Sequence, residues 1–207
     1  MGTRGTFGFR VKTKDKLAYN HFDSYLDGLG ADVCDFIKGS TNEELKETAR
    51  RILLVDGDKP PTKEQQKAVR DFEKKNDVVV SDTGVSSQSL DDWYCLLRKA
   101  QGKLDLYKLG LEYFLDGGNF VQDSLFCEYA YIINIDTGKL EVYEGLNKNP
   151  KAKGRYAKFK FGDSEGKYYG VALWKEVSFE DIRKANVTEL VTAWEKEMSD
   201  EYEKENV

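Results

Sequence analysis

Histidine, methionine, proline and cysteine are scarce in this chain. Its 207 residues include one His, two Met, three Pro and three Cys. One histidine and three widely separated cysteines do not have the ligand spacing of a zinc site, and an odd number of cysteines does not suggest a disulfide framework. We therefore expect no metal, no other cofactor and no disulfide, and we predict that Cys34, Cys95 and Cys127 are small buried hydrophobic residues.

Long apolar runs and a surplus of positive charge are also absent. No apolar run approaches the roughly 20 residues of a membrane-spanning helix, and the N-terminal segment lacks the apolar core of a signal peptide. We therefore expect a cytoplasmic protein without membrane contact. The 32 Lys and Arg residues are outnumbered by 37 Asp and Glu residues, which gives a net charge of −5. For this reason we expect no nucleic-acid partner.

One stretch departs from this charge balance. Residues 147–161, NKNPKAKGRYAKFKF, are basic with interleaved aromatic residues. Such a stretch could bind a single nucleic-acid strand by stacking of the bases. The alternation of Lys158 and Lys160 with aromatic residues favours the other interpretation, a solvated loop that leads into a half-buried strand.

The apolar residues, 40% of the chain, follow strand and helix periodicities in turn. Two strand–turn–strand patterns are clear, one over residues 3–22 and one over residues 127–145. A further strand is predicted at 167–177 and a polar surface loop at 76–89. Helical patterns cover residues 31–39, 40–55, 62–75, 90–102, 103–118, 178–185 and 186–207.

This order of elements predicts an α+β fold. We expect one antiparallel sheet, built from the N-terminal and central hairpins and packed with helices, in which residues 3–23 lie beside residues 127–143. The length favours a single domain over residues 1–207, with residues 200–207 frayed. Gly5 and Gly8 lie inside the first predicted strand, where glycine weakens pairing, so we expect a bulge or a close approach of another group to the backbone there.

The opening of the chain resembles a known enzyme family. The stretch GTRGTFGF, a turn, and then YNHFDSY is similar to the start of the choloylglycine-hydrolase and penicillin-acylase branch of the N-terminal nucleophile hydrolases. Thr3 and Arg4 match the residues that follow the nucleophile in that family, and Asn20 and Asp23 match its polar pair. Gly2 stands where the family has its nucleophilic Cys.

This resemblance covers residues 2–25 and implies a fold and an activity. The fold would be that of the N-terminal nucleophile hydrolases. The activity would be amide hydrolysis, with Thr3 as the nucleophile after removal of Met1 and Gly2. The free amine of Thr3, with a pKa of about 8, would be the base, and Asp23 would orient this amine. The same opening also resembles uncharacterised bacterial and phage-type proteins, which leaves a protein-interaction factor as a third alternative.

The N-terminal hairpin is therefore the predicted site. We expect a polar pocket, lined by the first strand and the loop 20–27, that binds a small polar ligand or a protein partner. In it Arg4 would hold an anionic group, Asn20 and Asp23 would bind polar atoms, and His21 would exchange protons. Thr3, His21 and Asp23 are the candidate catalytic residues, and a metal bound by His21, Asp23 and Asp27 is the less favoured alternative.

Overall fold

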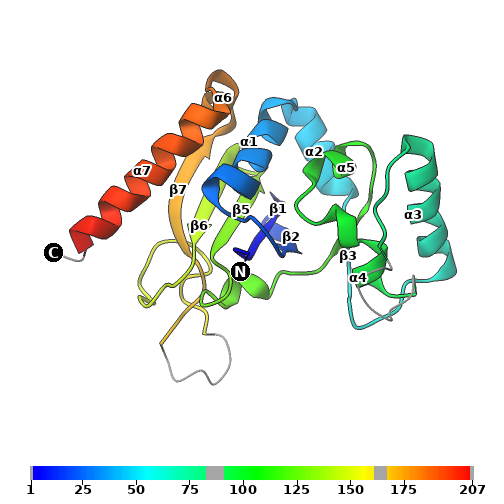
Figure 1. Ribbon diagram of the computed structural model, residues 1–207, viewed down its shortest axis with the longest axis horizontal. Coiled ribbons are helices and arrows are strands. Elements are labelled where there is room, and N and C mark those ends of the chain that lie inside the picture. The colour runs from blue at the N-terminus through cyan, green and yellow to red at the C-terminus, as the bar shows by residue number, and fades with distance from the viewer. Residues whose placement is uncertain (1, 83–90, 161–166, 206–207) are drawn as a thin grey trace.

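The computed structural model describes residues 2–82, 91–160 and 167–205 and has a five-stranded sheet at its centre (Figure 1). The strand order is β2-β1-β5-β6-β7. The strands of this sheet are β1 (Gly5–Val11), β2 (Lys14–Asn20), β5 (Tyr129–Asn134), β6 (Lys139–Glu144) and β7 (Ala172–Ser178). A separate pair is formed by β3 (Leu53–Val55) and β4 (Tyr113–Leu115).

Helices surround these strands. The α-helices are α1 (Ala31–Lys38), α2 (Asn42–Arg51), α3 (Lys63–Asn76), α4 (Trp93–Leu96), α5 (Leu104–Lys108), α6 (Phe179–Lys184) and α7 (Val187–Glu205). Short helical turns cover Leu26–Gly30, Arg98–Ala100 and Phe120–Gln122. No helix in the described part of the chain has the length and apolar content needed to cross a bilayer. Residues 83–89 of the predicted surface loop lie outside the described residues.

The two predicted hairpins share one sheet, as expected. β1 pairs with β2, β5 pairs with β6, and the hairpins meet where Gly5 of β1 lies opposite Tyr129 of β5. The sheet is mostly antiparallel, but this junction is parallel, which the sequence analysis did not predict. Each hairpin is antiparallel because a short turn joins its strands, whereas β1 and β5 are joined by a long crossover that permits either direction.

The two faces of the sheet are packed differently. Phe7 and Phe9 of β1 are fully buried on the face that α1, α6 and α7 cover, and Phe9 packs edge-on against Phe36 of α1 at 6.1 Å between ring centroids. The opposite face packs against loops, and its smaller buried cluster includes Leu17 and Cys127. All three cysteines are buried, which confirms the prediction of their burial.

A network of charged and phenolic side chains ties the loop after β6 to this second face. Arg155 donates to both oxygens of Asp15, at 3.1 and 3.2 Å, and to Oε2 of Glu141 at 2.5 Å. Arg10 donates to Asp15 at 2.8 Å, and the Tyr156 hydroxyl donates to it at 2.6 Å. Burial raises the pKa of Asp15, but the hydrogen bonds from Tyr156, Arg155 and Arg10 outweigh this, so the net pKa is lowered.

The structure corrects part of the interpretation of residues 147–161 as a solvated loop that runs into a strand: Lys158 and Lys160 are exposed as expected, but the described residues, 147–160, contain no strand. Asn147 and Tyr156 are buried, at 7% and 6% exposure. The alternation around Lys158 and Lys160 predicted a strand, but the hydrogen bonds of the loop to the sheet decided its conformation instead.

Two predicted helices are replaced in part by strands in the structure. The helix predicted at 40–55 ends at Arg51, and residues Leu53–Val55 form β3. The helix predicted at 103–118 is α5 followed by β4, which pairs with β3 in parallel. Gly110 has a φ of +117°, a conformation outside the helical region. The two apolar triplets form strands because each provides the other's hydrogen-bonding partner, a long-range effect that overrides local helical periodicity.

Gly5 and Gly8 confirm the expectation of close backbone approach. A Cβ atom at Gly5 would lie 2.6 Å from the carbonyl oxygen of Tyr129 and 2.8 Å from Oγ of Ser24. A Cβ atom at Gly8 would lie 2.1 Å from the carbonyl oxygen of Lys16, and the φ of Gly8 is +155°. Both glycines thus leave room for neighbouring backbone in the centre of the sheet.

Side-chain hydrogen bonds hold both ends of α2. Thr41 caps its N-terminus in a capping box. At the C-terminus, Nζ of Lys16 on β2 donates to the carbonyl oxygens of Ala49, Arg50 and Ile52, at 2.8, 3.1 and 2.5 Å. These carbonyls have no partner inside the helix, and a cation there also interacts favourably with the helix dipole. Lys16 therefore fastens α2 to the sheet.

Replacement of Lys16 by Met is expected to lower the free energy of unfolding by about 1.5–3 kcal/mol, because a charged donor to three helix-terminal carbonyls is lost. Urea unfolding followed by tryptophan fluorescence measures the change. Lys14→Met is the matched control, since Lys14 is exposed on the same strand. Equal midpoints for the two variants would show that the Lys16 contacts contribute nothing.

Candidate functional site

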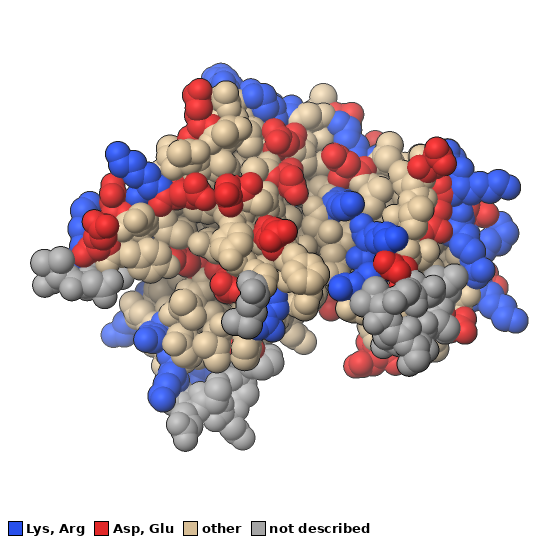
Figure 2. All heavy atoms as spheres, in the orientation of Figure 1, with Lys and Arg blue, Asp and Glu red and all other residues tan. Residues whose placement is uncertain are grey.

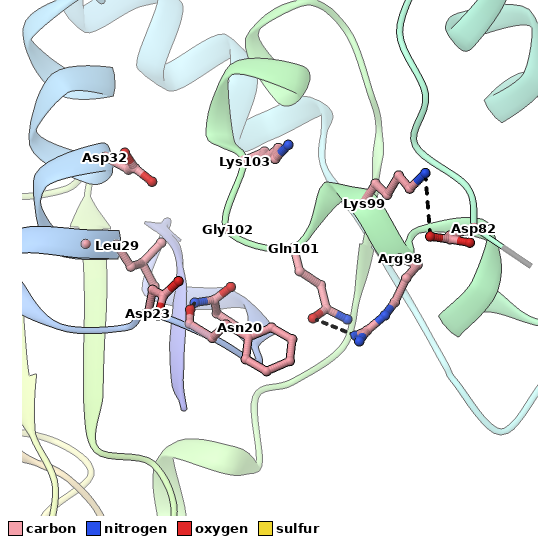
Figure 3. A pocket seen from close by; sticks show the side chains of 12 residues that line it. Asn20, Asp23, Leu29, Asp32, Asp82, Arg98, Lys99, Gln101, Gly102 and Lys103 are labelled. Atoms are coloured by element: carbon pink, nitrogen blue, oxygen red, sulfur yellow. Dashed lines mark hydrogen bonds and ion pairs between the residues drawn. The ribbon is translucent and has the colours of Figure 1, made fainter. Parts of the chain in front are cut away.

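A cavity of about 420 Å³ lies between the loop that follows β2 and residues 98–103 (Figure 3). One wall comes from the loop and the first turn of α1, and it includes Asn20, Asp23 and Asp32. The other wall comes from the segment after α4. The volume is within the usual range for sites that bind small molecules.

Hydrogen bonds hold the loop that forms the first wall. Nδ2 of Asn20 donates to the carbonyl oxygen of Phe22 at 2.5 Å and to Oγ of Ser24 at 2.9 Å. The Tyr131 hydroxyl donates to the carbonyl oxygen of Ser24 at 3.0 Å. With the loop fixed in this way, Asp23 takes a left-handed conformation with φ of 52° and is exposed beside the cavity.

The walls meet at Gly102. Its φ is +73°, and a Cβ atom there would lie 2.9 Å from Oδ1 of Asn20. A glycine is required at this position both for the backbone angle and for the close approach. Gly102 therefore allows residues 98–103 to lie directly against the end of β2.

The second wall is basic. The Arg98 guanidinium lies 4.8 Å from the centre of the Tyr94 ring and donates to Oε1 of Gln101 at 3.3 Å. Lys99 forms an ion pair with Asp82 at 3.5 Å. Among the residues that the structure describes, neither Arg98 nor Lys103 forms an ion pair with a carboxylate. Two positive charges on this wall are thus available to a ligand.

A second cluster lies next to the cavity and shares Arg98 with it. The Tyr19 hydroxyl and Nδ1 of His21 are 2.6 Å apart and share a hydrogen bond. Burial, together with the Arg98 and Arg4 guanidiniums, lowers the pKa of His21 below its usual 6.5. These effects favour the neutral form of the His21 imidazole. The Arg4 guanidinium lies 4.8 Å from the centre of the Phe126 ring.

The structure separates the residues that the sequence analysis grouped. Asn20 and Asp23 line the cavity, whereas Thr3, Arg4 and His21 are not among its lining residues. Thr3 is 2% exposed, and its carbonyl oxygen accepts a hydrogen bond from the Ser24 amide. β2 ends at Asn20, so His21 and Asp23 do not share one face of a strand.

The basic wall was missed at the sequence level. The apolar pattern around residues 98–103, RKAQGK, predicts that they belong to two helices and does not indicate a site. Three cations in six residues around a glycine were a signal that could have been noticed. In the described ranges, no group of His, Cys, Asp and Glu side chains has the arrangement needed to hold a metal ion.

Known proteins offer no further guide to the site. Comparison of the chain with protein-family models, with curated proteins and with solved structures found no match. The resemblance of residues 2–25 to N-terminal nucleophile hydrolases and to phage-type proteins therefore stays a prediction. The geometry of the cavity is the basis on which a function can be proposed.

Proposed function

We propose that the protein binds a small polar ligand in the cavity between the loop after β2 and residues 98–103. The observation that carries this proposal is a cavity whose two walls present side-chain charges not used in ion pairs within the described chain. A charged group that faces a cavity without a partner favours a ligand of opposite charge, because the two form a charge-assisted hydrogen bond.

The proposal gives each wall a role. Arg98 is held by the Tyr94 ring and by Gln101, so little rotational entropy is lost when it binds an acidic group. Asp23 and Oδ1 of Asn20 accept hydrogen bonds from the ligand. The alternative that uses Thr3 as a nucleophile gains no support from the geometry, since Thr3 is buried away from the cavity.

Arg98→Gln is expected to weaken the binding of acidic ligands by about 10- to 100-fold, the effect of losing one charge-assisted hydrogen-bonding partner. The measurement is a titration of the ¹⁵N-labelled full chain with a library of small polar compounds, followed by amide NMR. Binding compounds should shift the amide signals of residues 20–29 and 98–103.

The matched control is Arg50→Gln, because Arg50 is exposed on α2 outside the cavity. It should bind each compound as the unaltered chain does. The proposal fails if no compound shifts the amides of both walls, or if Arg98→Gln and Arg50→Gln bind acidic compounds equally.

A further inference from the structure

The two walls of the cavity carry charges of opposite sign. Figure 3 shows Asp23 and Asp32 on one side and Arg98, Lys103 and Lys99 on the other, where Lys99 is paired with Asp82; Gly102 lies between the two sides. In the space-filling view, basic side chains gather between α1 and α3, and acidic side chains lie across from them toward α7 (Figure 2). The cavity is thus a slot between a negative and a positive wall.

These opposite charges compensate one another only in part, since Lys103 lies near enough to Asp32 to lower its pKa. Across the described residues, no ion pair joins Asp23 or Asp32 to Arg98 or Lys103. The backbone at Asp32 is held in place by the fully buried Val33 and Cys34 of α1, and Arg98 on the other wall is stacked on Tyr94. The separation of charge is therefore built into the fold.

The acidic wall is further biased toward a cation. Burial and the nearby carboxylates of Asp35 and Asp105 raise the pKa of Asp32, while Lys103 opposes the rise. A second hollow of about 380 Å³ adjoins the first and is lined by Asp32, Asp35 and Asp105 together with Lys103. A bound ammonium group would relieve the repulsion among these carboxylates.

The charge pattern selects one class of ligand. A simple anion would pair with Arg98 and Lys103 but would be repelled by the carboxylates of the acidic wall. A simple cation would be attracted by those carboxylates but repelled by the basic wall. A molecule with both charges at opposite ends satisfies both walls. We infer, given the function proposed above, that the ligand is a zwitterion, a free amino acid or short peptide, with its ammonium group at Asp32 and its carboxylate at Arg98 and Lys103.

The test is a calorimetric titration of the full chain with the 20 free amino acids and with alanyl dipeptides. Acetate, inorganic phosphate and ethylamine serve as probes with a single charge. At least one zwitterion is expected to bind, and N-acetylation or C-amidation of it should each weaken binding at least tenfold. Each hit is checked by amide NMR for shifts at residues 20–29 and 98–103.

Variants assign the two ends of the ligand. Asp32→Asn should weaken binding of the zwitterion at least tenfold but leave binding of its N-acetylated form unchanged. Lys103→Gln should likewise weaken binding of the zwitterion at least tenfold but leave binding of its C-amidated form unchanged. Both side chains are exposed, so both variants should fold, which circular dichroism checks. Asp58→Asn and Lys63→Gln are the controls, and they should bind like the unaltered chain.

The outcomes separate this inference from the proposed function. If a probe with a single charge, or a capped form, binds at the cavity as tightly as every zwitterion, the cavity is a ligand site but the zwitterion inference is wrong. The zwitterion inference is also wrong, and the cavity is still a ligand site, if no zwitterion binds but a compound of the library shifts the amide signals of both walls. If nothing in either set binds, both proposals fail.

Discussion

Replacement of Arg155 by Met is expected to lower the free energy of unfolding by about 2–4 kcal/mol. The guanidinium contacts two carboxylates, Asp15 and Glu141, and lies 4.8 Å from the centre of the Tyr156 ring. Glu141 is 4% exposed, so its loss of a cationic partner leaves a charge that water cannot solvate well. Arg155 itself is 25% exposed, which screens part of the effect.

The remaining members of the network cannot replace Arg155. The Tyr143 hydroxyl and Nδ2 of Asn134 donate to Glu141, at 3.0 and 2.6 Å, but both are uncharged. Arg10 pairs with Asp15 and leaves Glu141 without a cation. The variant therefore has two carboxylates and one guanidinium where the unaltered network is balanced.

Urea unfolding of the single and double variants measures this effect. A cycle of Arg155→Met and Glu141→Gln should show a coupling energy above about 1 kcal/mol, because the residues are in direct contact. Lys67→Met, which removes the exposed ion pair with Asp71, is the control and should cost about 0.3–0.5 kcal/mol. A loss for Arg155→Met no larger than that of the control would contradict a stabilising role.

Gly8→Ala is expected to destabilise the protein by about 2–4 kcal/mol. Its new Cβ would meet the carbonyl oxygen of Lys16 at 2.1 Å and Cα of Leu17 at 3.0 Å, and the φ of +155° is unfavourable for alanine. These are backbone atoms of the neighbouring strand β2, so no side chain can rotate away. The pairing of β1 with β2 must open locally to accept the methyl group.

The matched control for Gly8→Ala is Gly138→Ala. Gly138 has a φ of +69°, but a Cβ atom there meets no other atom within 4 Å. It therefore reports the backbone strain alone, about 1–2 kcal/mol. Thermal and urea unfolding should rank Gly8→Ala as the less stable variant. If both variants unfold at the same midpoint, the close approach to β2 has no energetic consequence.

The amino-acid sequence alone determined the local units of this fold. The alternation of Phe7 and Phe9 with smaller residues, and the turn at Gly138, are properties of neighbouring residues, so both hairpins could be predicted. The burial of the cysteines and the close contacts at Gly5 and Gly8 were also predictable. Glycine inside a strand weakens the strand, and it often marks a bulge or a place where other atoms lie too close to the backbone for a side chain.

Only the tertiary structure decided how distant segments meet. The parallel pairing of β1 with β5, the formation of β3 and β4 in place of helix ends, and the contacts of Arg155 all join residues far apart in the chain. Strand propensity depends on the partner that a segment finds. For the same reason, local periodicity misassigned the segments 53–55 and 113–115.

The candidate site illustrates the same division. The loop with Asn20 and Asp23 was predicted because these residues match the polar pair of the N-terminal nucleophile hydrolases and follow a predicted strand. The opposite wall, with Arg98 and Lys103, was not, because nothing in residues 98–103 indicates that they lie against the end of β2. That contact depends on the packing of whole elements and on the space left by Gly102, and it brings together charges of opposite sign that no local pattern relates.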